Sequence, residues 1–228
     1  MKTALVTGAN KGIGLEVVRQ LLNRNFNVIL TARNRDKGLR AIEKLKNRDE
    51  KLLFVQMDVG NEDSIKKAAK EVQSKNIKID LIVNNAGVLL DSESINEVSS
   101  EKILTTFRVN TLGPILVIQN FLPIMNKNGR IINVSSGLGA FSEMSSYAPV
   151  YSISKSALNA ITKQFSFSLV ENNISVNSVS PGWVKTDMGG SNAARTVQKG
   201  AETIVWLAEE APHNLTGKFF RDKKEMDW

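Results

Sequence analysis

The sequence predicts an α/β protein with one doubly wound parallel sheet of about seven strands and helices on both faces. Short runs rich in β-branched residues alternate with longer segments of helical periodicity along all 228 residues. Most of the short runs are apolar on both faces, which is typical of parallel strands covered by helices on each side. No internal repeat, low-complexity tract or linker interrupts the alternation. We therefore expect a single domain over residues 1–228.

The strands are expected where short apolar runs lie between turn-forming residues. Six runs are clear, and a seventh near the C-terminal end is weak. The predicted strands are 3–7, 27–31, 52–57, 79–85, 130–136, 174–180 and 217–220.

The helices are expected between these strands, with right-handed connections. Asn61 shows the clearest start signal, because asparagine is a good N-cap residue and acids follow it in the first turn. The predicted helices are 12–24, 35–47, 61–75, 99–126, 152–171 and 194–210.

Composition excludes several kinds of site. The chain has no cysteine, which removes disulfides, thiol nucleophiles and iron–sulfur clusters. Its single histidine, His213, cannot form a two-histidine metal site, and we interpret it as a solvated loop residue. No metal site is expected. Tyrosine, lysine, serine and carboxylates remain as acid–base groups.

Charge and hydropathy indicate which classes of partner the protein is not expected to bind. The net charge is +7, but the basic residues of segment 33–51 are interleaved with acids, which is typical of a solvated helix face rather than a nucleic-acid surface. No apolar run is long enough to span a membrane. The apolar run at the N-terminus ends at Gly8, too early for a signal peptide. We expect a cytoplasmic protein without a nucleic-acid or membrane partner.

A glycine-rich loop follows the first predicted strand and opens the first predicted helix. Gly8, Gly12 and Gly14 have the spacing TGxxxGxG in the stretch VTGANKGIGLE. Glycines permit a tight turn there and let a pyrophosphate approach the positive end of the helix. The pattern favours a Rossmann-type nucleotide site over a tight turn without a ligand, although a glycine motif alone is a weak signal.

This glycine spacing differs from the common GxGxxG fingerprint. Together with further motifs along nearly the whole chain, it resembles the short-chain dehydrogenase/reductase family, and in particular its carbonyl-reductase-like branch. Those motifs are NNAG at 84–87, Asn110 in RVNTLGP, NVSS at 133–136, YxxxK at 151–155 and SPGWVKTDM at 180–188.

The second predicted strand indicates which nucleotide is bound. An acid that binds the adenosine ribose is expected about 20 residues beyond the glycines, but Thr31, Ala32 and Arg33 occupy that stretch and no acid precedes Asp36. A guanidinium suits a 2′-phosphate, and Lys11 can add a second positive charge. NADPH is therefore preferred over NADH, unless Arg33 is only a solvated residue at a helix start.

The segment YAPVYSISK holds both tyrosines of the chain. Tyr151 and Lys155 lie four residues apart and share a helix face, whereas Pro149 places Tyr147 before the helix. Geometry alone thus selects Tyr151 as the acid that protonates a developing alkoxide. We expect the Lys155 ammonium to lower the pKa of this phenol. Tyr147 is expected to line the substrate pocket or to be packed.

The resemblance implies the rest of the site. Ser136 should polarise the substrate carbonyl, although Ser135 also ends the fifth strand and the register between them is open. Asn110 should hold a water behind Lys155, or else bond backbone within a helix. The cofactor-binding residues implied are Gly8, Asn10, Lys11, Gly12, Ile13, Gly14, Arg33, Asp58, Val59, Asn85, Ala86, Gly87, Tyr151, Lys155, Pro181, Gly182, Val184 and Thr186.

The expected function is NADPH-dependent reduction of aldehydes, ketones or quinones. Segment 183–200 should form a short lid with a hinge at Gly189 and Gly190 over an apolar pocket. The alternatives are an oxidative secondary-alcohol dehydrogenase and an NADPH-binding signalling protein with little catalysis; a nucleic-acid binder is a remote third. The predicted helices 99–126 and 152–171 carry surplus apolar residues that predict a homodimer: Leu112, Ile115, Leu116, Phe165 and Leu169.

Overall fold

The protein is built around one eight-stranded sheet. The structure is a computed structural model that describes residues 1–45 and 49–228. The strand order is β3-β2-β1-β4-β5-β6-β7-β8, and every neighbouring pair is parallel except β7 and β8. This confirms the predicted α/β fold. The strands are β1 Thr3–Val6, β2 Asn27–Ala32, β3 Leu52–Gln56, β4 Ile79–Asn84, β5 Met125–Val134, β6 Ser175–Val179, β7 Phe219–Arg221 and β8 Lys224–Glu225.

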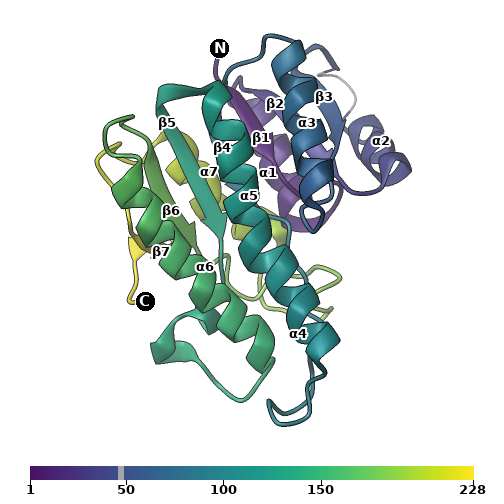
Figure 1. The fold of residues 1–228 in the computed structure, drawn as a ribbon, viewed down its shortest axis with the longest axis vertical. Coiled ribbons are helices and arrows are strands. Elements are labelled where there is room, and N and C mark those ends of the chain that lie inside the picture. Colours follow the sequence, from purple (N-terminus) through teal and green to yellow (C-terminus); the bar gives the residue numbers. More distant parts are fainter. Residues whose placement is uncertain (46–48) are drawn as a thin grey trace.

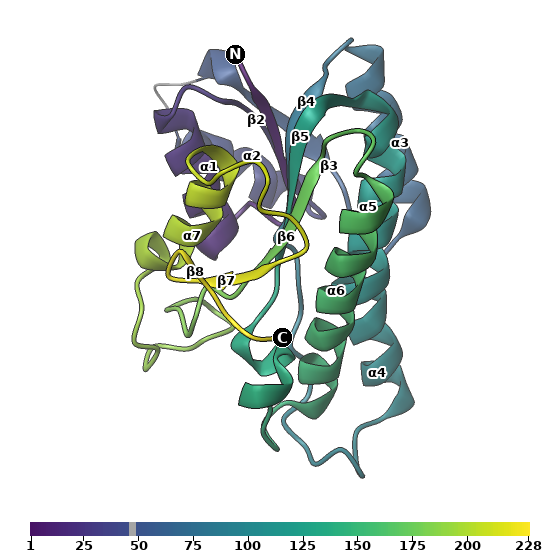
Figure 2. The ribbon, with the colours of Figure 1, turned by 90° about the vertical axis from the view of Figure 1, so that its left-hand side faces the viewer.

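Helices cover both faces of the sheet in three layers (Figures 1 and 2). Each face has its own apolar core, because the central strands are buried on both sides. One face carries α1 Gly12–Asn23, α2 Arg35–Glu43 and α7 Val197–Glu209; the other carries α3 Glu62–Ser74, α4 Ser100–Phe107, α5 Gly113–Phe121 and α6 Pro149–Ser168.

The predicted helix 99–126 is interrupted and shorter. A π-helical turn, Arg108–Leu112, separates α4 from α5, and a 3₁₀ turn, Leu122–Ile124, ends the helical run. The fifth strand then begins at Met125 instead of residue 130, because Met125 pairs with Ile79 across a register shift. Helix α2 ends at Glu43, earlier than the predicted helix 35–47, and residues 46 and 47 lie outside the described residues.

Other boundaries also differ from the prediction; helix α7, for example, begins at Val197 instead of residue 194. Helix α6 begins at Pro149 rather than residue 152, because proline suits the first helical turn. Tyr147 lies before the helix, as expected. The eighth strand arises from a tight hairpin after β7, in which Asp222 and Lys223 have φ of 53° and 62°, as the turns that match strand twist require.

Parallel strands place their carboxyl ends on one edge of the sheet. The loops after β1, β4, β5 and β6 therefore meet there, and in such folds ligands bind at this edge. In Figure 1 the arrowhead of β5 points to this edge. Within the described residues, no helix is both long and apolar enough to cross a membrane.

Candidate active site

The glycine loop packs directly on the loop after β4. Gly8 and Gly12 have φ of 62° and 59°, a conformation that other residues rarely adopt. A Cβ added at Gly8 would lie 2.9 Å from Ala86 Cα, and one added at Gly14 would lie 2.4 Å from Asn85 Nδ2. The Asn85 side chain donates to the Thr7 carbonyl at 2.8 Å. Close packing against the loop after β4 thus explains Gly8 and Gly14, and we name the glycine loop with the start of α1 the cradle.

The residues assigned to the 2′-phosphate lie on the surface beside this cradle. Arg33 follows β2, is exposed, and forms no ion pair with any described residue. Lys11 instead pairs with Asp187 of the lid segment at 2.5 Å. This contact lowers the pKa of Asp187, and Lys37 acts in the same direction. Lys11, Arg33 and Lys37 therefore place positive charge at the carboxyl end of the sheet.

The acid after β3 is held by its own loop. The Asp58 carboxylate accepts the Gly60 backbone N–H at 2.9 Å, and its backbone N–H donates to Ser64 Oγ at 2.9 Å. The adjacent Val59 is buried, and its carbonyl lies close to Gly113 at the start of α5. Asp58 and Val59 thus lie at the carboxyl end of β3, as expected for residues assigned to the adenine side.

Tyr151 and Lys155 lie in the first two turns of α6 and are almost completely buried, at 8% and 4% exposure. The Lys155 ammonium is 5.6 Å from the centre of the Tyr151 ring. It donates a hydrogen bond of 2.8 Å to the carbonyl of Val134, the last residue of β5. The strand end therefore fixes the lysine, and the lysine lies against the phenol.

Burial, rather than the charge of the lysine, is the main cause of the pKa shifts of Tyr151 and Lys155. It raises the pKa of Tyr151 to about 12, with the Ser136 side-chain hydrogen bond opposing the shift and Tyr147 adding to it. Burial also lowers the pKa of Lys155 to about 8. The expected depression of the phenol pKa by Lys155 is therefore wrong for this structure, because both groups are taken from water and each favours its neutral form.

The two serines after β5 have different surroundings. Ser135 is buried and its hydroxyl donates to the Lys155 carbonyl at 3.3 Å. Ser136 is partly exposed and accepts the Leu138 backbone N–H at 3.2 Å, and its side chain is close enough to Tyr151 to lower the pKa of the phenol. Only Ser136 thus faces the phenol.

Asn110 lies in the π-helical turn and is completely buried. Its side chain accepts the Val88 backbone N–H and donates to the Val88 carbonyl, both at 2.8 Å, and also donates to Ser154 Oγ at 3.1 Å. Gly87 lies beside it, because a Cβ there would be 3.3 Å from Asn110 Oδ1 and 3.5 Å from Lys155 Nζ. Asn110 therefore ties the loop after β4 to helix α6.

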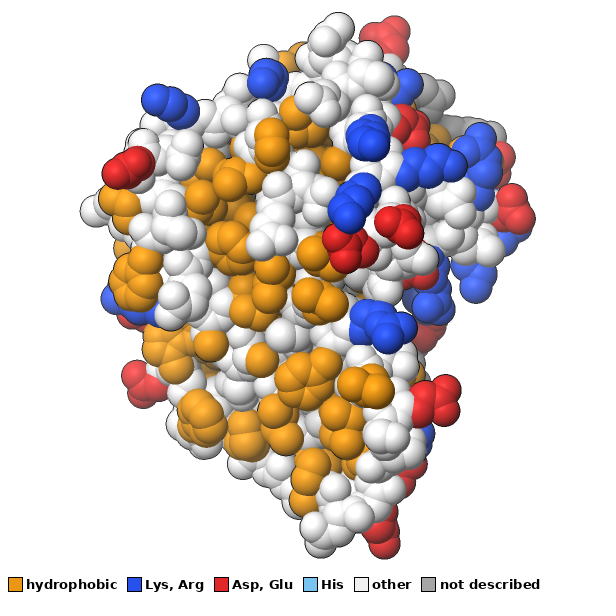
Figure 3. All heavy atoms as spheres, in the orientation of Figure 1, with side chains coloured by type: hydrophobic (Ala, Val, Ile, Leu, Met, Phe, Trp, Pro, Cys, Tyr) orange, Lys and Arg blue, Asp and Glu red, His pale blue; other side chains and the backbone are white. Residues whose placement is uncertain are grey.

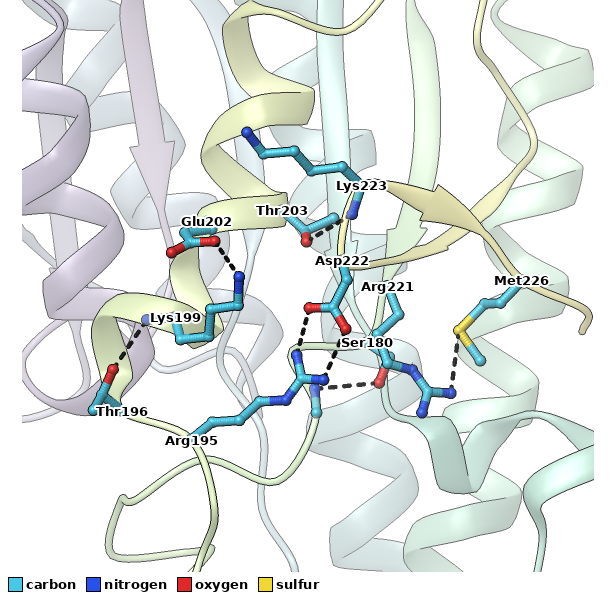
Figure 4. Close-up of polar contacts among 11 residues, drawn as sticks. Ser180, Arg195, Thr196, Lys199, Glu202, Thr203, Arg221, Asp222, Lys223 and Met226 are labelled. Atoms are coloured by element: carbon cyan, nitrogen blue, oxygen red, sulfur yellow. Dashed lines mark hydrogen bonds and ion pairs between the residues drawn. The ribbon is translucent and has the colours of Figure 1, made fainter.

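The lid segment is fastened at its base. Val184 and Arg195 form a parallel bridge, and the Arg195 guanidinium bonds both carboxylate oxygens of Asp222 at 2.6 and 2.8 Å. In Figure 4 these two side chains point toward one another from the lid and from the turn between β7 and β8. Thr186 lies against the glycine loop, 3.3 Å from where a Cβ of Gly12 would be.

The turn that holds the two lid glycines is also fixed. The Trp183 indole donates to the Gly189 carbonyl at 2.8 Å, and the Gly190 N–H donates to the Thr186 carbonyl at 2.9 Å. A Cβ on Gly189 would lie 2.1 Å from the Val184 carbonyl oxygen, so close packing requires this glycine. The hinge expected there remains a prediction.

Exposed apolar side chains lie in the loops at the carboxyl edge of the sheet and are named here the apolar rim. They extend from the loops after β4 and β5 and from the lid, each between 39% and 77% exposed. Isolated exposed apolar residues are ordinary, but a group at one site marks a binding surface. The members of this apolar rim are Leu90, Ile95, Phe141, Tyr147, Trp183 and Met188.

His213 lies away from this site. Its Nε2 is 2.7 Å from the carbonyl of Asn173, which precedes β6 and so lies at the opposite edge of the sheet.

Sequence reasoning missed two other residues, Asp91 and Arg195, whose partners are distant in sequence. Asp91 is 1% exposed and bonds the start of α6. Neither has a local pattern that marks it.

Known proteins resemble this chain along its whole length. Carbonyl reductase [NADPH] 1 of Sus scrofa is 30% identical, with 100% of this chain and 94% of that protein covered. (+)-Neomenthol dehydrogenase of Arabidopsis thaliana is 31% identical, with coverage of 99% and 97%. The structure of carbonyl reductase Sniffer of D. melanogaster superimposes with a TM-score of 0.91 at 32% identity, and both chains are covered completely. The family model for short chain dehydrogenase matches residues 2–197, and the chain therefore belongs to this family.

Proposed function

We propose that the protein is an NADPH-dependent carbonyl reductase in which Tyr151 is the general acid. The observation that carries the proposal is the buried pair of Tyr151 and Lys155, which lies at the carboxyl edge of the sheet with Ser136 beside the phenol. The carbonyl reductases among the relatives support the reaction class.

The cradle fits a dinucleotide. Glycines in left-handed conformations bring backbone N–H groups to the start of α1, where the helix dipole favours a pyrophosphate. Arg33 and Lys11 would bind the 2′-phosphate, and Asp58 with Val59 would border the adenine. Lys155 would bind the nicotinamide ribose. The remaining assigned residues, in the glycine loop, the loop after β4 and the lid, would enclose the pyrophosphate and the nicotinamide: Asn10, Ile13, Ala86, Pro181, Gly182, Val184 and Thr186.

The residues around the phenol each have a distinct task. The cofactor site would hold NADPH, which would supply the hydride when bound. Ser136 donates a hydrogen bond to the carbonyl oxygen, and Tyr151 gives its proton to that oxygen as negative charge develops. Lys155 stabilises the resulting phenolate. Asn110 holds Val88 and Ser154 in place behind Lys155, and its part in a proton relay remains a prediction.

The rim residues support an apolar substrate. Exposed aromatic and aliphatic side chains lie in three loops at the carboxyl edge of the sheet, the same edge as Tyr151. An apolar aldehyde, ketone or quinone would lose little hydration there, while its single oxygen reaches Ser136 and Tyr151. Small charged carbonyl compounds have no ion-pair partner among the rim residues.

The oxidative alternative is favoured by one observation only, the likeness to (+)-neomenthol dehydrogenase. The Tyr151 phenol, whose pKa burial raises to about 12, is protonated at neutral pH and can donate the proton that reduction requires. The burial of Tyr151 against Lys155 also argues against a signalling protein with little catalysis.

The test is NADPH oxidation by the purified protein with a panel of carbonyl compounds. The panel should contain an aliphatic aldehyde, an aromatic ketone and an ortho-quinone, with pyruvate as a small charged comparison. We expect turnover of the apolar members and little with pyruvate. Binding of NADPH without turnover of any member would overturn the proposal and favour the signalling alternative.

The pH dependence follows from Lys155. Its lowered pKa of about 8 means that the ammonium, which the mechanism requires, is lost above that pH. We expect kcat/KM for NADPH, which reports ionisations of the free enzyme, to fall by about tenfold per pH unit above pH 8. Lys155→Arg should lower the rate at neutral pH but remove this decline, because a guanidinium stays protonated. A flat profile of the unaltered enzyme up to pH 10 would contradict the assignment.

A second copy of the chain is the proposed partner. In Figure 3 apolar side chains gather on the face formed by α4, α5 and α6. Leu112 is exposed there, but Leu169, also expected on this face, is buried in the core at 3% exposure. Contiguous apolar surface of this kind marks interfaces. The exposed members of this helical face are Leu104, Leu112, Ile153, Phe167 and Val170.

The homodimer prediction is tested by sedimentation. We expect a mass about twice the 25.1 kDa of one chain at micromolar concentration. Phe167→Lys, at a side chain 61% exposed on the helical face, should dissociate the dimer. Leu39→Lys, at an exposed leucine of α2 on the other side of the sheet, should not. A mass near 25.1 kDa for the unaltered chain would refute the dimer.

A further inference from the structure

Helix α6, which carries Tyr151 and Lys155, begins without a cap of its own. The residue before it, Ala148, has φ of 47° and makes no side-chain cap hydrogen bond. Pro149 at the first position has no N–H. The free N–H groups of the first turn are therefore those of Val150 and Tyr151, and buried N–H groups of this kind need acceptors.

The acceptor comes from a segment about sixty residues earlier. Asp91 is 1% exposed, and its carboxylate accepts the Val150 N–H at 2.7 Å and the Tyr151 N–H at 3.2 Å. A carboxylate at a helix N-terminus is favoured by the helix dipole, and hydrogen bonds to a charged acceptor are strong. Asp91 thus holds the backbone of the proposed general acid itself.

The same segment also holds the other side of the site. Asp91 lies four residues after Gly87, which is next to the Lys155 ammonium, and three after Val88, which is bonded by Asn110. The chain from 87 to 91 therefore runs from the cofactor cradle to the first turn of α6. A shift of this segment would move the first turn of α6, and Tyr151 with it, relative to Ser136 after β5.

We infer that Asp91 is a positioning residue that sets the place of the Tyr151 phenol by bonding the Tyr151 backbone. The inference rests on the proposed role of Tyr151. If Asp91 were only a helix cap, its loss would lower stability and leave the rate of the folded enzyme unchanged. If it positions the acid, its loss should lower kcat and leave NADPH binding nearly unchanged, because misplacement of about 1 Å can cost 100-fold in rate.

The first experiment compares two Asp→Asn variants. Asp91→Asn keeps the shape but turns an amide donor toward one of the two N–H groups. Asp80→Asn is the matched control, because Asp80 also accepts a backbone N–H, that of Thr3 at 2.7 Å, at the opposite edge of the sheet. We expect kcat to fall about tenfold in Asp91→Asn and less than twofold in Asp80→Asn, with the NADPH dissociation constant within about twofold in both. Rates are measured well below each melting temperature, so that only folded enzyme is compared.

The second experiment combines Asp91→Asn with Tyr151→Phe. If Asp91 acts through the phenol, the double variant should be no slower than Tyr151→Phe alone. Multiplicative losses, or a kcat of Asp91→Asn equal to that of the unaltered enzyme, would overturn the inference and leave the role of Tyr151 standing. Full activity of Tyr151→Phe by itself would overturn both. Should Asp91→Asn not fold, Asp91→Ser, which keeps a short acceptor, replaces it in the same two comparisons.

Discussion

Tyr151→Phe is expected to lower the rate of carbonyl reduction by about 10²- to 10⁴-fold, the loss typical of a missing general acid. The ring stays in place, but the proton donor beside Lys155 is deleted. Folding and NADPH affinity should survive, because neither depends mainly on this hydroxyl. The measurement is kcat with one good aldehyde, together with an NADPH titration and a thermal melt of the variant.

Tyr147→Phe is the matched control for this prediction. Tyr147 lies in the rim, 58% exposed and before the start of α6. Its loss should alter KM or substrate preference and change kcat by less than about tenfold, or roughly 1.4 kcal/mol. Equal losses in both variants would indicate a proton relay shared by the two phenols, and a larger loss at Tyr147 would overturn the assignment of Tyr151.

Arg33→Asp is expected to reverse the cofactor preference. It removes the guanidinium proposed to bind the 2′-phosphate and supplies an acid for the ribose hydroxyls of NADH. We expect kcat/KM for NADPH to fall by about 100-fold, which corresponds to roughly 2.7 kcal/mol, while that for NADH improves. Both constants are measured with a single aldehyde at fixed ionic strength, because surface electrostatics depend on salt.

Arg40→Asp is the control for charge alone. Arg40 is an exposed residue in the last turn of α2, so the substitution makes the same change in net charge away from the carboxyl end of β2. It should leave the preference between NADPH and NADH nearly unchanged. If the two variants lost NADPH efficiency equally, or if Arg33→Asp lost none, the assignment of Arg33 would be wrong.

The fold was predictable because strand and helix periods differ along the sequence. The central strands are apolar on both faces, and their approximate positions followed from that pattern alone. The π-helical turn at Arg108–Leu112 was not predicted, although Gly113 and Pro114 follow it directly and Pro114 lacks the N–H that an unbroken α-helix would need there. The sequence also did not predict the early start of β5, since the stretch 125–129 joins the sheet only through pairing with β4.

The site was predictable where chemistry depends on spacing along one element. Tyr151 was preferred over Tyr147 because only Tyr151 has a lysine one helical turn later. Protonation was not predictable, because the burial that raises the pKa of Tyr151 and lowers that of Lys155 comes from distant segments. The role of Asp91 was not predictable for the same reason, since the N–H groups that donate to its carboxylate lie 59 and 60 residues away.

The π-helical turn holds a buried residue of the site and also sets the directions in which exposed side chains of α4 and α5 point. Each residue of an α-helix turns the chain by about 100°, so Leu104 and Leu112 would lie roughly 80° apart on an unbroken helix. The wider turn absorbs about one residue and reduces this angle to roughly 20°. The insertion that contains buried Asn110 thus also aligns these two exposed leucines. Deleting one residue there would displace Asn110 and would also rotate the two exposed leucines apart.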